Sequence, residues 1–257
     1  MADELAALDW DAPWLDAWRD PGARLLAQRG ARPIHELLNG LDAPVRFVPQ
    51  SDLSEGEAYE SHIFRGGGCP TRDNLHDFFN GLCWIHFPRS KQRCNELHQV
   101  EIARDGVGAR RGPVRDAITI LDENGALLYA PAPLWEALLA RDWKRLFVEL
   151  RPLWWQARLV IFGHALLEKL AHPRKELTAH VWCANMPDGG LAEMDAALAD
   201  ALSATRLADK PFTPLPVFGI PGWCEQNQNF SFYDDSFVFR PAGHRTKQNK
   251  PVRRHAT

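Results

Sequence analysis

Polar and charged side chains stand among core-like residues in one stretch of the chain, 71–123. The members that could do chemistry are two imidazoles, two amides, two carboxylates and a guanidinium: His76, Asn80, Asn95, His98, Glu101, Arg115 and Asp116. In a protein interior such groups need hydrogen-bond partners or a ligand, because an unpartnered amide or imidazole costs roughly 1 to 3 kcal/mol. Imidazoles and carboxylates together support general acid–base catalysis and divalent-metal binding. This stretch is therefore the candidate site.

A helix over 72–87 is predicted to carry part of this site. Thr71 fits the helix-capping position before it, and Pro88 ends it. Its side chains are apolar around almost the whole circumference, a pattern typical of a buried helix. His76 and Asn80 lie four residues apart on one face and then point inward. We assign His76 to catalysis or metal binding, and Asn80 and Trp84 to substrate binding.

A second helix is predicted over 90–104, close to the first because only about three residues connect them. One narrow face of this helix presents Asn95, His98 and Glu101. Two functional interpretations are open. In the first, His98 is a general base that Glu101 orients; in the second, His76, His98 and Glu101 bind a divalent metal. The alternative is a polar network that holds two core helices together and has no catalytic role.

Further candidates come from outside the two helices. Arg115 and Asp116 follow a loop rich in Gly and Arg, and we expect Arg115 to steer an anionic substrate and Asp116 to belong to the catalytic set. Asn95 joins the substrate-binding residues, and His164 is a further candidate metal ligand. We interpret the acids at 122–123 as turn-forming residues, because they stand beside an Asn-Gly pair.

The elements that must position these residues indicate an α+β fold. Two β-rich runs flank Asn124 and Gly125, the pair best suited to a tight turn, so we predict a hairpin at 117-130. We expect helices at 12–19, 22–29, 33–41, 134–141, 143–151, 153–171 and 191–207, strands at 177–184 and 237–240, and irregular chain at 211–223. The chain should form a single mostly helical domain with a small antiparallel sheet.

Length and charge set the domain boundaries. The chain has 257 residues, of which 45% are hydrophobic, enough for one sizeable core, and we expect a single globular domain over 1-240. The segment 241-257 carries five Lys or Arg residues and no acid, so we predict a basic, disordered tail. Since the net charge is −3, the first 240 residues carry −8, which argues against dedicated nucleic-acid binding.

Other features indicate a cytoplasmic protein. The first twenty residues contain acids where a secretory signal needs a basic start and an apolar run. The strongest membrane candidate, 159–167, is too short to span a bilayer. The five cysteines form no CxxC pair, which argues against a disulfide framework or a structural zinc site. We expect a reducing compartment and no membrane partner.

Several motifs together carry a resemblance to a known family. They are HDFFNGLCWIHFPRSK (76–91), NELH (95–98), RDAITILDENG (115–125), FGHALLEK (162–169), PGW (221–223), FYDD (232–235) and FRP (239–241). In these runs the chain resembles the bacterial domain-of-unknown-function 3025 family, over about 59–241. The resemblance implies a bacterial protein with one domain. It supplies no activity and no catalytic residues, but its motifs contain most of the polar set selected above.

The function expected from the sequence is that of a cytoplasmic, hydrolase-like enzyme. Its site would use acid–base or metal-assisted chemistry on an anionic small molecule or a phosphoester. A divalent metal ion is the candidate cofactor. The alternative is a non-catalytic binding protein whose buried His, Asn and Glu set is a structural polar network. The two interpretations differ in one observable, the convergence of the candidate side chains on an accessible pocket.

Overall fold

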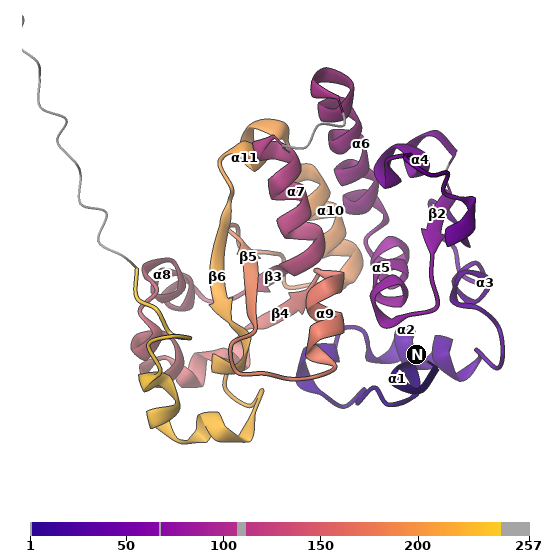
Figure 1. The fold of residues 1–257 in the computed structure, drawn as a ribbon. Helices are drawn as coiled ribbons and strands as arrows, with labels where there is room; N and C mark the ends of the chain where they lie inside the picture. Colours follow the sequence, from indigo (N-terminus) through magenta and orange to yellow (C-terminus); the bar gives the residue numbers. More distant parts are fainter. Residues whose placement is uncertain (1, 67, 107–111, 243–257) are drawn as a thin grey trace, which may run out of the picture.

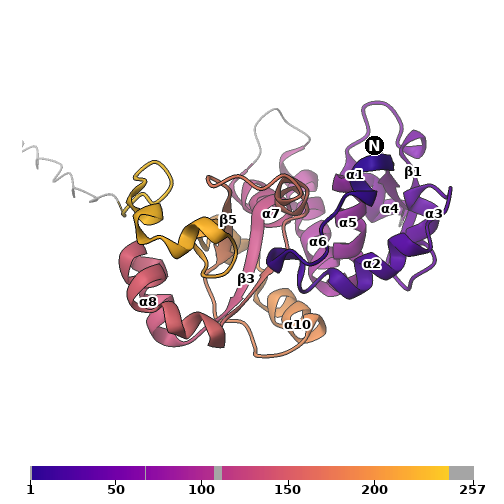
Figure 2. The same cartoon turned by 90° about the horizontal axis from the view of Figure 1, so that it is seen from below.

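The computed structural model describes residues 2–66, 68–106 and 112–242 (Figure 1). The predicted basic tail, 241-257, lies almost entirely outside the described residues, as does most of the Gly- and Arg-rich loop before Arg115. Figure 1 shows the larger sheet beside helix α8 and the C-terminal segment, and helices α1 to α4 on the opposite side. Helices α5, α6 and α7 lie between these two groups, an arrangement that Figure 2 shows from below.

The larger sheet has four strands in the order β4-β3-β5-β6. Its members are β3 (Gly125–Tyr129), β4 (Arg158–Ile161), β5 (Thr178–Trp182) and β6 (Phe212–Pro216). Strand β3 pairs antiparallel with β4 and parallel with β5, and β5 pairs antiparallel with β6. A second sheet joins β1 (Arg46–Pro49) and β2 (Gly68–Thr71) in parallel. The α+β class is confirmed, but the sheets are mixed and parallel rather than antiparallel.

Helices make up most of the remaining chain. They are α1 (Ala2–Ala6), α2 (Arg19–Ala27), α3 (Ile34–Leu38), α4 (Tyr59–Gly66), α5 (Leu75–His86), α6 (Pro88–Asp105), α7 (Pro113–Asn124), α8 (Ala132–Ala140), α9 (His164–Leu170), α10 (Leu191–Ala201) and α11 (Ala204–Ala208). Short 3₁₀ turns and a π turn at Arg145–Glu149 complete the fold. None of the described helices is long and apolar enough to cross a membrane.

Helices α5 and α6 are packed neighbours, as predicted. The side chain of Asn74 caps α5 by accepting a hydrogen bond from the backbone N–H of Asp77, so the helix begins three residues later than expected. Apolar residues on every side of α5 are buried, among them Phe78, Phe79 and Leu82. Pro88 begins α6 after a single residue, Phe87, and this short connection places the polar face of α6 beside α5.

The hairpin at 117-130 was a wrong prediction. Its first half belongs to α7, and only its second half, β3, is a strand. The buried residues Val114, Ala117, Ile118 and Leu121 follow the spacing of one helical face, and this period outweighs the local β propensity of the isoleucines. Strand β3 therefore pairs with β4 and β5, which come from more distant parts of the chain.

Other element predictions were also wrong in part. The expected helix 153–171 is a 3₁₀ turn, strand β4 and helix α9, and the expected helix 191–207 is split into α10 and α11. The segment 211–223 contains β6 although it is rich in proline. Proline is tolerated there because β6 is an edge strand. The expected strand 237–240 is not a strand.

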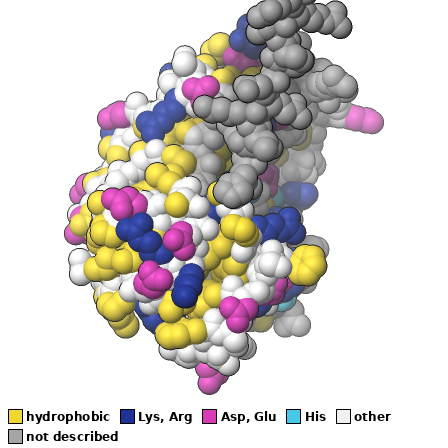
Figure 3. Space-filling model, turned by 90° about the vertical axis from the view of Figure 1, so that its left-hand side faces the viewer, with side chains coloured by type: hydrophobic (Ala, Val, Ile, Leu, Met, Phe, Trp, Pro, Cys, Tyr) yellow, Lys and Arg dark blue, Asp and Glu magenta, His cyan; other side chains and the backbone are white. Residues whose placement is uncertain are grey.

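The surface beside the larger sheet carries mixed charge. Figure 3 shows this face, the left-hand side of Figure 1, with hydrophobic, basic and acidic side chains interspersed over its described part. The same mixture is expected from a chain with similar numbers of basic and acidic residues, 30 and 33.

Candidate functional site

The candidate site is a cavity of about 380 Å³ between α4, α5, α6, α7 and the start of α9. Its lining is half polar and includes Tyr59, Glu60, Ile63, Arg72, His76, Asp77, Asn80, Trp84, Lys91, Asn95, His98, Ile118, Thr119, Asp122, Glu123 and His164. Four of these side chains are carboxylates and two are permanent cations. The wall therefore carries an excess of negative charge.

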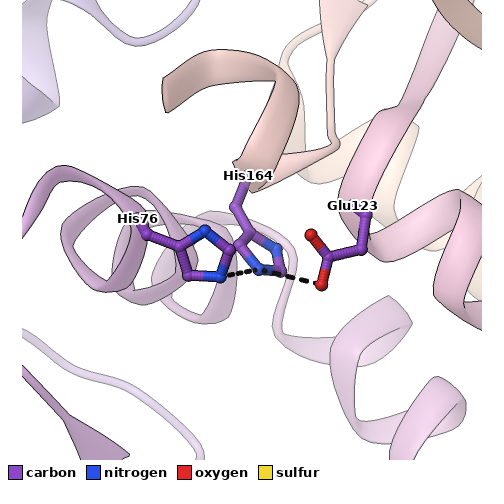
Figure 4. A group of neighbouring side chains, drawn as sticks. All are labelled: His76, Glu123 and His164. Carbon is purple, nitrogen blue, oxygen red and sulfur yellow. Dashed lines mark hydrogen bonds and ion pairs between the residues drawn. The ribbon is translucent and has the colours of Figure 1, made fainter. Parts of the chain in front are cut away.

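Two imidazoles and a carboxylate meet in this wall (Figure 4). His76 lies in the first turn of α5, Glu123 in the last turn of α7, and His164 begins α9. The two Nε2 atoms are 3.0 Å apart, and Oε1 of Glu123 lies 3.8 Å from Nε2 of His164. One ligand atom from each of the three residues lies within 4.8 Å of the others. We call these three residues the His76 triad.

A close backbone contact brings the ends of α7 and α9 together. The backbone N–H groups of Phe162 and Gly163 both donate to the carbonyl of Gly125, at 3.0 and 2.8 Å. A Cβ atom on Gly163 would lie 2.5 Å from the backbone nitrogen of Asn124, so only glycine fits here. Glu123 and His164 are consequently neighbours although they are far apart in sequence.

Each histidine of the triad has a carboxylate behind it. Nδ1 of His76 lies 2.9 Å from Oε2 of Glu168, and Nδ1 of His164 lies 3.8 Å from Oδ1 of Asp122. Burial lowers the pKa of His164 to about 4, against the opposing effect of Asp122, so this imidazole is neutral at pH 7. Neutral imidazoles supported by carboxylates on the far nitrogen are typical of metal-ligating histidines.

Beyond the triad, the buried ammonium of Lys91 bonds two residues of the cavity wall. Nζ of Lys91 donates to Oδ1 of Asn80 at 2.9 Å and to Oδ1 of Asp122 at 2.5 Å. The amide of Asn80 donates in turn to the hydroxyl of Tyr59, at 3.0 Å, and that hydroxyl lies 3.1 Å from Sγ of Cys69. This series of polar contacts fixes the rotamers of Lys91, Asn80 and Tyr59, which face the cavity.

Charge coupling in the wall sets the ionisation of its groups. Burial alone would raise the pKa of Asp122 and lower that of Lys91, but their mutual attraction outweighs burial and keeps both charged. For Glu123 the balance is the opposite: burial and the neighbouring Asp122 charge raise its pKa and outweigh the lowering effects of His76, Lys91 and Lys169.

The structure brings together six of the nine residues selected from the sequence. The cavity is lined by His76, Asn80, Trp84, Asn95, His98 and His164. Glu101, Arg115 and Asp116 are not among the described residues that line the cavity. The carboxylate of Glu101 pairs with Arg104 at 2.8 Å, and Asp116 lies 3.9 Å from Nζ of Lys210. Glu101 thus takes part in an ion pair within α6.

Sequence reasoning missed the charged residues that complete the site. Asp122 and Glu123 were interpreted as turn-formers, whereas they occupy the last turn of α7 and face the cavity. Lys91 and Glu168 had no assigned role. The signal that could have found the two acids is the helical spacing of the apolar residues before them, since it places 122 and 123 on a helix rather than in a turn.

Comparison with known proteins gives a family without an assigned activity. No curated protein and no solved structure matches the chain. Residues 45–243 match the family model described as "Protein of unknown function (DUF3025)", and this range includes every residue of the His76 triad. Because the match covers well over half of its length, the chain belongs to the DUF3025 family.

Proposed function

We propose that this protein is a metal-dependent hydrolase whose single divalent ion, most simply zinc, is held by the His76 triad. The observation that carries the proposal is the convergence of two imidazole Nε2 atoms and a carboxylate oxygen on one point of a cavity wall. Two histidines and one glutamate are a known ligand set of catalytic zinc, which keeps a fourth position open for water or substrate.

The geometry of the triad fits this ion. With metal–ligand bonds of about 2.0 to 2.1 Å, tetrahedral ligand atoms lie roughly 3.3 Å apart. The measured separations of 3.0 and 3.8 Å lie on either side of that value. A divalent charge would also offset the excess of carboxylates in the wall, and it would favour the charged form of Glu123, which burial and Asp122 disfavour.

In this proposal, each residue of the site has a separate role in the reaction. A divalent ion at the triad supplies Lewis-acid polarisation of a carbonyl or phosphoryl oxygen. Glu168 orients the imidazole of His76 from behind through a hydrogen bond, and the carboxylate of Asp122 stands 3.8 Å behind the imidazole of His164. His98 lines the same cavity and is our candidate for the general base. We propose an anionic small molecule or phosphoester as substrate and the cytoplasm as the compartment, where the five free thiols would stay reduced.

Metal binding is the direct test. Protein purified without a histidine tag and stripped with a chelator is titrated with zinc, and we expect one equivalent to bind. His76→Gln, Glu123→Gln and His164→Gln should each weaken zinc binding by at least about 100-fold, since outer-shell losses alone cost 10- to 100-fold. The matched control is His62→Gln, because His62 forms the other close histidine–carboxylate pair, with Glu57 at 3.0 Å, outside the cavity lining.

A screen of phosphoester, carboxylester and amide substrates on the zinc-loaded protein then identifies the reaction. Activity should require zinc and should fall with the triad variants but not with His62→Gln. A protein that binds no zinc, or binds it equally well without His76 and His164, would end the proposal.

A second candidate function is a non-catalytic binding protein. It is favoured by the series of hydrogen bonds through Lys91, Asn80 and Tyr59, which gives each of these buried groups a partner without any ligand. In that case the triad variants should destabilise the protein as the loss of a structural network does, and the substrate screen should find nothing.

A further inference from the structure

The ammonium of Lys91 is held in an arrangement that leaves part of its hydrogen-bonding capacity unused. An ammonium group has three donors. Two of them reach Asn80 and Asp122, and among the described residues no third acceptor lies within hydrogen-bond distance. The side chain is only 5% exposed, yet Lys91 lines the cavity. A cation that served only to neutralise Asp122 would not need to border this space.

The surroundings of Lys91 hold the ammonium in one place. The ring of Trp84 lies beneath it, with Nζ 5.2 Å from the ring centroid, at a distance where the cation is attracted to the ring face. Asp122 fixes it from another side and also stands behind His164. The ammonium and the His76 triad are thus connected through one carboxylate and border the same cavity.

We propose that Lys91 forms an oxyanion subsite, which binds a phosphate or carboxylate group of the substrate while the scissile bond lies at the His76 triad. This inference rests on the proposed function and names the substrate class of the same site. A desolvated, preorganised ammonium is a strong partner for an oxyanion, because charge-assisted hydrogen bonds are about twice as strong as neutral ones.

A second cation at the cavity supports an anionic ligand. Arg72 lines the cavity and donates from Nε and Nη2 to Asp77, both at 3.0 Å. Its pKa is raised, chiefly by the hydrogen bond to Asp77 and to a smaller extent by nearby charges that include Glu168. Its side chain is 56% exposed, so it can meet a charged ligand that arrives from solvent.

The experiment measures anion binding in two variants. Replacing Lys91 alone would leave the Asp122 carboxylate buried and unpaired, so the test compares wild type with the double variant Lys91→Met/Asp122→Asn. Loss of the carboxylate removes a charge that repels anions, so weaker anion binding by the double variant reports the loss of the ammonium. Lys169→Met is the charge control, because Lys169 lies near the site on α9, bonds Asn124 at 3.3 Å and does not line the cavity. Circular dichroism melts check that each variant is folded.

Inorganic phosphate and acetate are titrated by calorimetry into wild type and variants, with one equivalent of zinc and without metal. Wild type and Lys169→Met should bind at least one of the anions with similar affinity, within about threefold. The double variant should bind it at least about 10-fold more weakly, the size of a lost charge-assisted hydrogen bond. The preferred anion distinguishes a phosphorylated substrate from a carboxylate.

The zinc titration reports separately on the proposed function, so the two ideas can fail independently. If zinc does not bind but phosphate or acetate binds to the metal-free protein through Lys91, the subsite stands and the hydrolase proposal falls. If the double variant binds the anions as well as wild type does, or if wild type binds neither anion in either state, the Lys91 subsite is overturned.

Discussion

The histidine pair is the most constrained feature of the protein at the scale of single residues. Two imidazoles whose Nε2 atoms are 3.0 Å apart cannot both be protonated without strong repulsion. His164 is 5% exposed and its pKa is about 4, so it is the member that stays neutral. A neutral nitrogen turned towards a cavity is available either to accept a proton from its neighbour or to bind a cation.

The buried state of His164 predicts acid sensitivity in the metal-free protein. Between pH 6.5 and about 4 the unfolded chain protonates this histidine and the folded chain does not, so unfolding becomes more favourable as the pH falls. The pKa difference corresponds to a loss of about 3 kcal/mol of unfolding free energy across this window. Urea denaturation at several pH values measures it.

The comparison that isolates His164 is the slope of stability with pH. His164→Gln should have a shallower slope than wild type, whatever its absolute stability. The exposed His172→Gln serves as control and should follow the wild-type curve. Parallel curves for wild type and His164→Gln would show that this side chain is not buried as the structure has it.

Glu123 allows function to be separated from stability. Its raised pKa means that the charged carboxylate is disfavoured in the folded, metal-free protein, by burial and by Asp122. Glu123→Gln keeps the size and removes the charge, so we predict no loss of unfolding free energy and a large loss of zinc affinity. Functional positions often show this opposition. Equilibrium denaturation and zinc titration of the same variant check both halves, and a destabilised variant with unchanged zinc affinity would contradict the assignment.

Among the elements, those with one dominant signal were predictable and those with two competing signals were not. Helix α5 has apolar residues all round and a proline after it, and this signal outweighs the Asn80-Gly81 pair in its middle. In 117–124, Ile118 and Ile120 favour a strand locally, while the positions that become buried favour a helix. The outcome depended on packing against α9 and β5, which a local pattern does not contain.

The same competition of signals explains why the two acids at the end of α7 were predicted to lie in a turn. Asn124 and Gly125 do mark a change of direction, but it is the passage from a helix to a strand rather than a hairpin turn. The sequence analysis therefore noticed Asp122 and Glu123 but placed them in a turn instead of in the last turn of α7. His76 and His164 were selected because their neighbours are apolar, and that signal does not depend on which element carries them.

Substitution of Gly163 tests whether the contact between α7 and α9 holds Glu123 and His164 together. A Cβ atom there would lie 2.5 Å from the Asn124 nitrogen, and backbone cannot yield as a side chain can. Gly163→Ala should therefore separate the ends of α7 and α9, at a cost of roughly 2 to 3 kcal/mol. Because Glu123 and His164 move apart with them, zinc affinity should fall as well.

Gly66→Ala is the matched control for this substitution. Gly66 is also a helix-end glycine, and an added Cβ would meet no atom within 4 Å. That variant should keep wild-type stability and zinc affinity. Chemical denaturation and metal titration measure the unfolding free energy and the zinc affinity of both variants. A Gly163→Ala protein with wild-type values would show that the contact between α7 and α9 can accommodate a Cβ atom.

For the whole molecule, the site is an assembly of segments far apart in the chain. His76 and His164 are 88 positions apart, and Glu123 comes from between them. The residue types were visible in the sequence, but their convergence depends on the order of the strands and on the packing of α5, α7 and α9. This is why the family resemblance and the buried-helix argument pointed to the region without giving the His76 triad.

A ligand held by three such segments should stabilise the entire fold. Zinc that binds the folded chain and not the unfolded chain adds about 2.7 kcal/mol of unfolding free energy at a concentration 100 times its Kd, and about 4.1 kcal/mol at 1,000 times. Thermal melts of the metal-free protein at rising zinc concentrations should therefore shift upwards without reaching a plateau. His76→Gln, Glu123→Gln and His164→Gln should remove the shift, and His62→Gln, whose imidazole pairs with Glu57 outside the triad, should retain it. A shift that persists in all three triad variants would mean that zinc binds elsewhere, and the His76 triad would then be a structural contact between α5, α7 and α9.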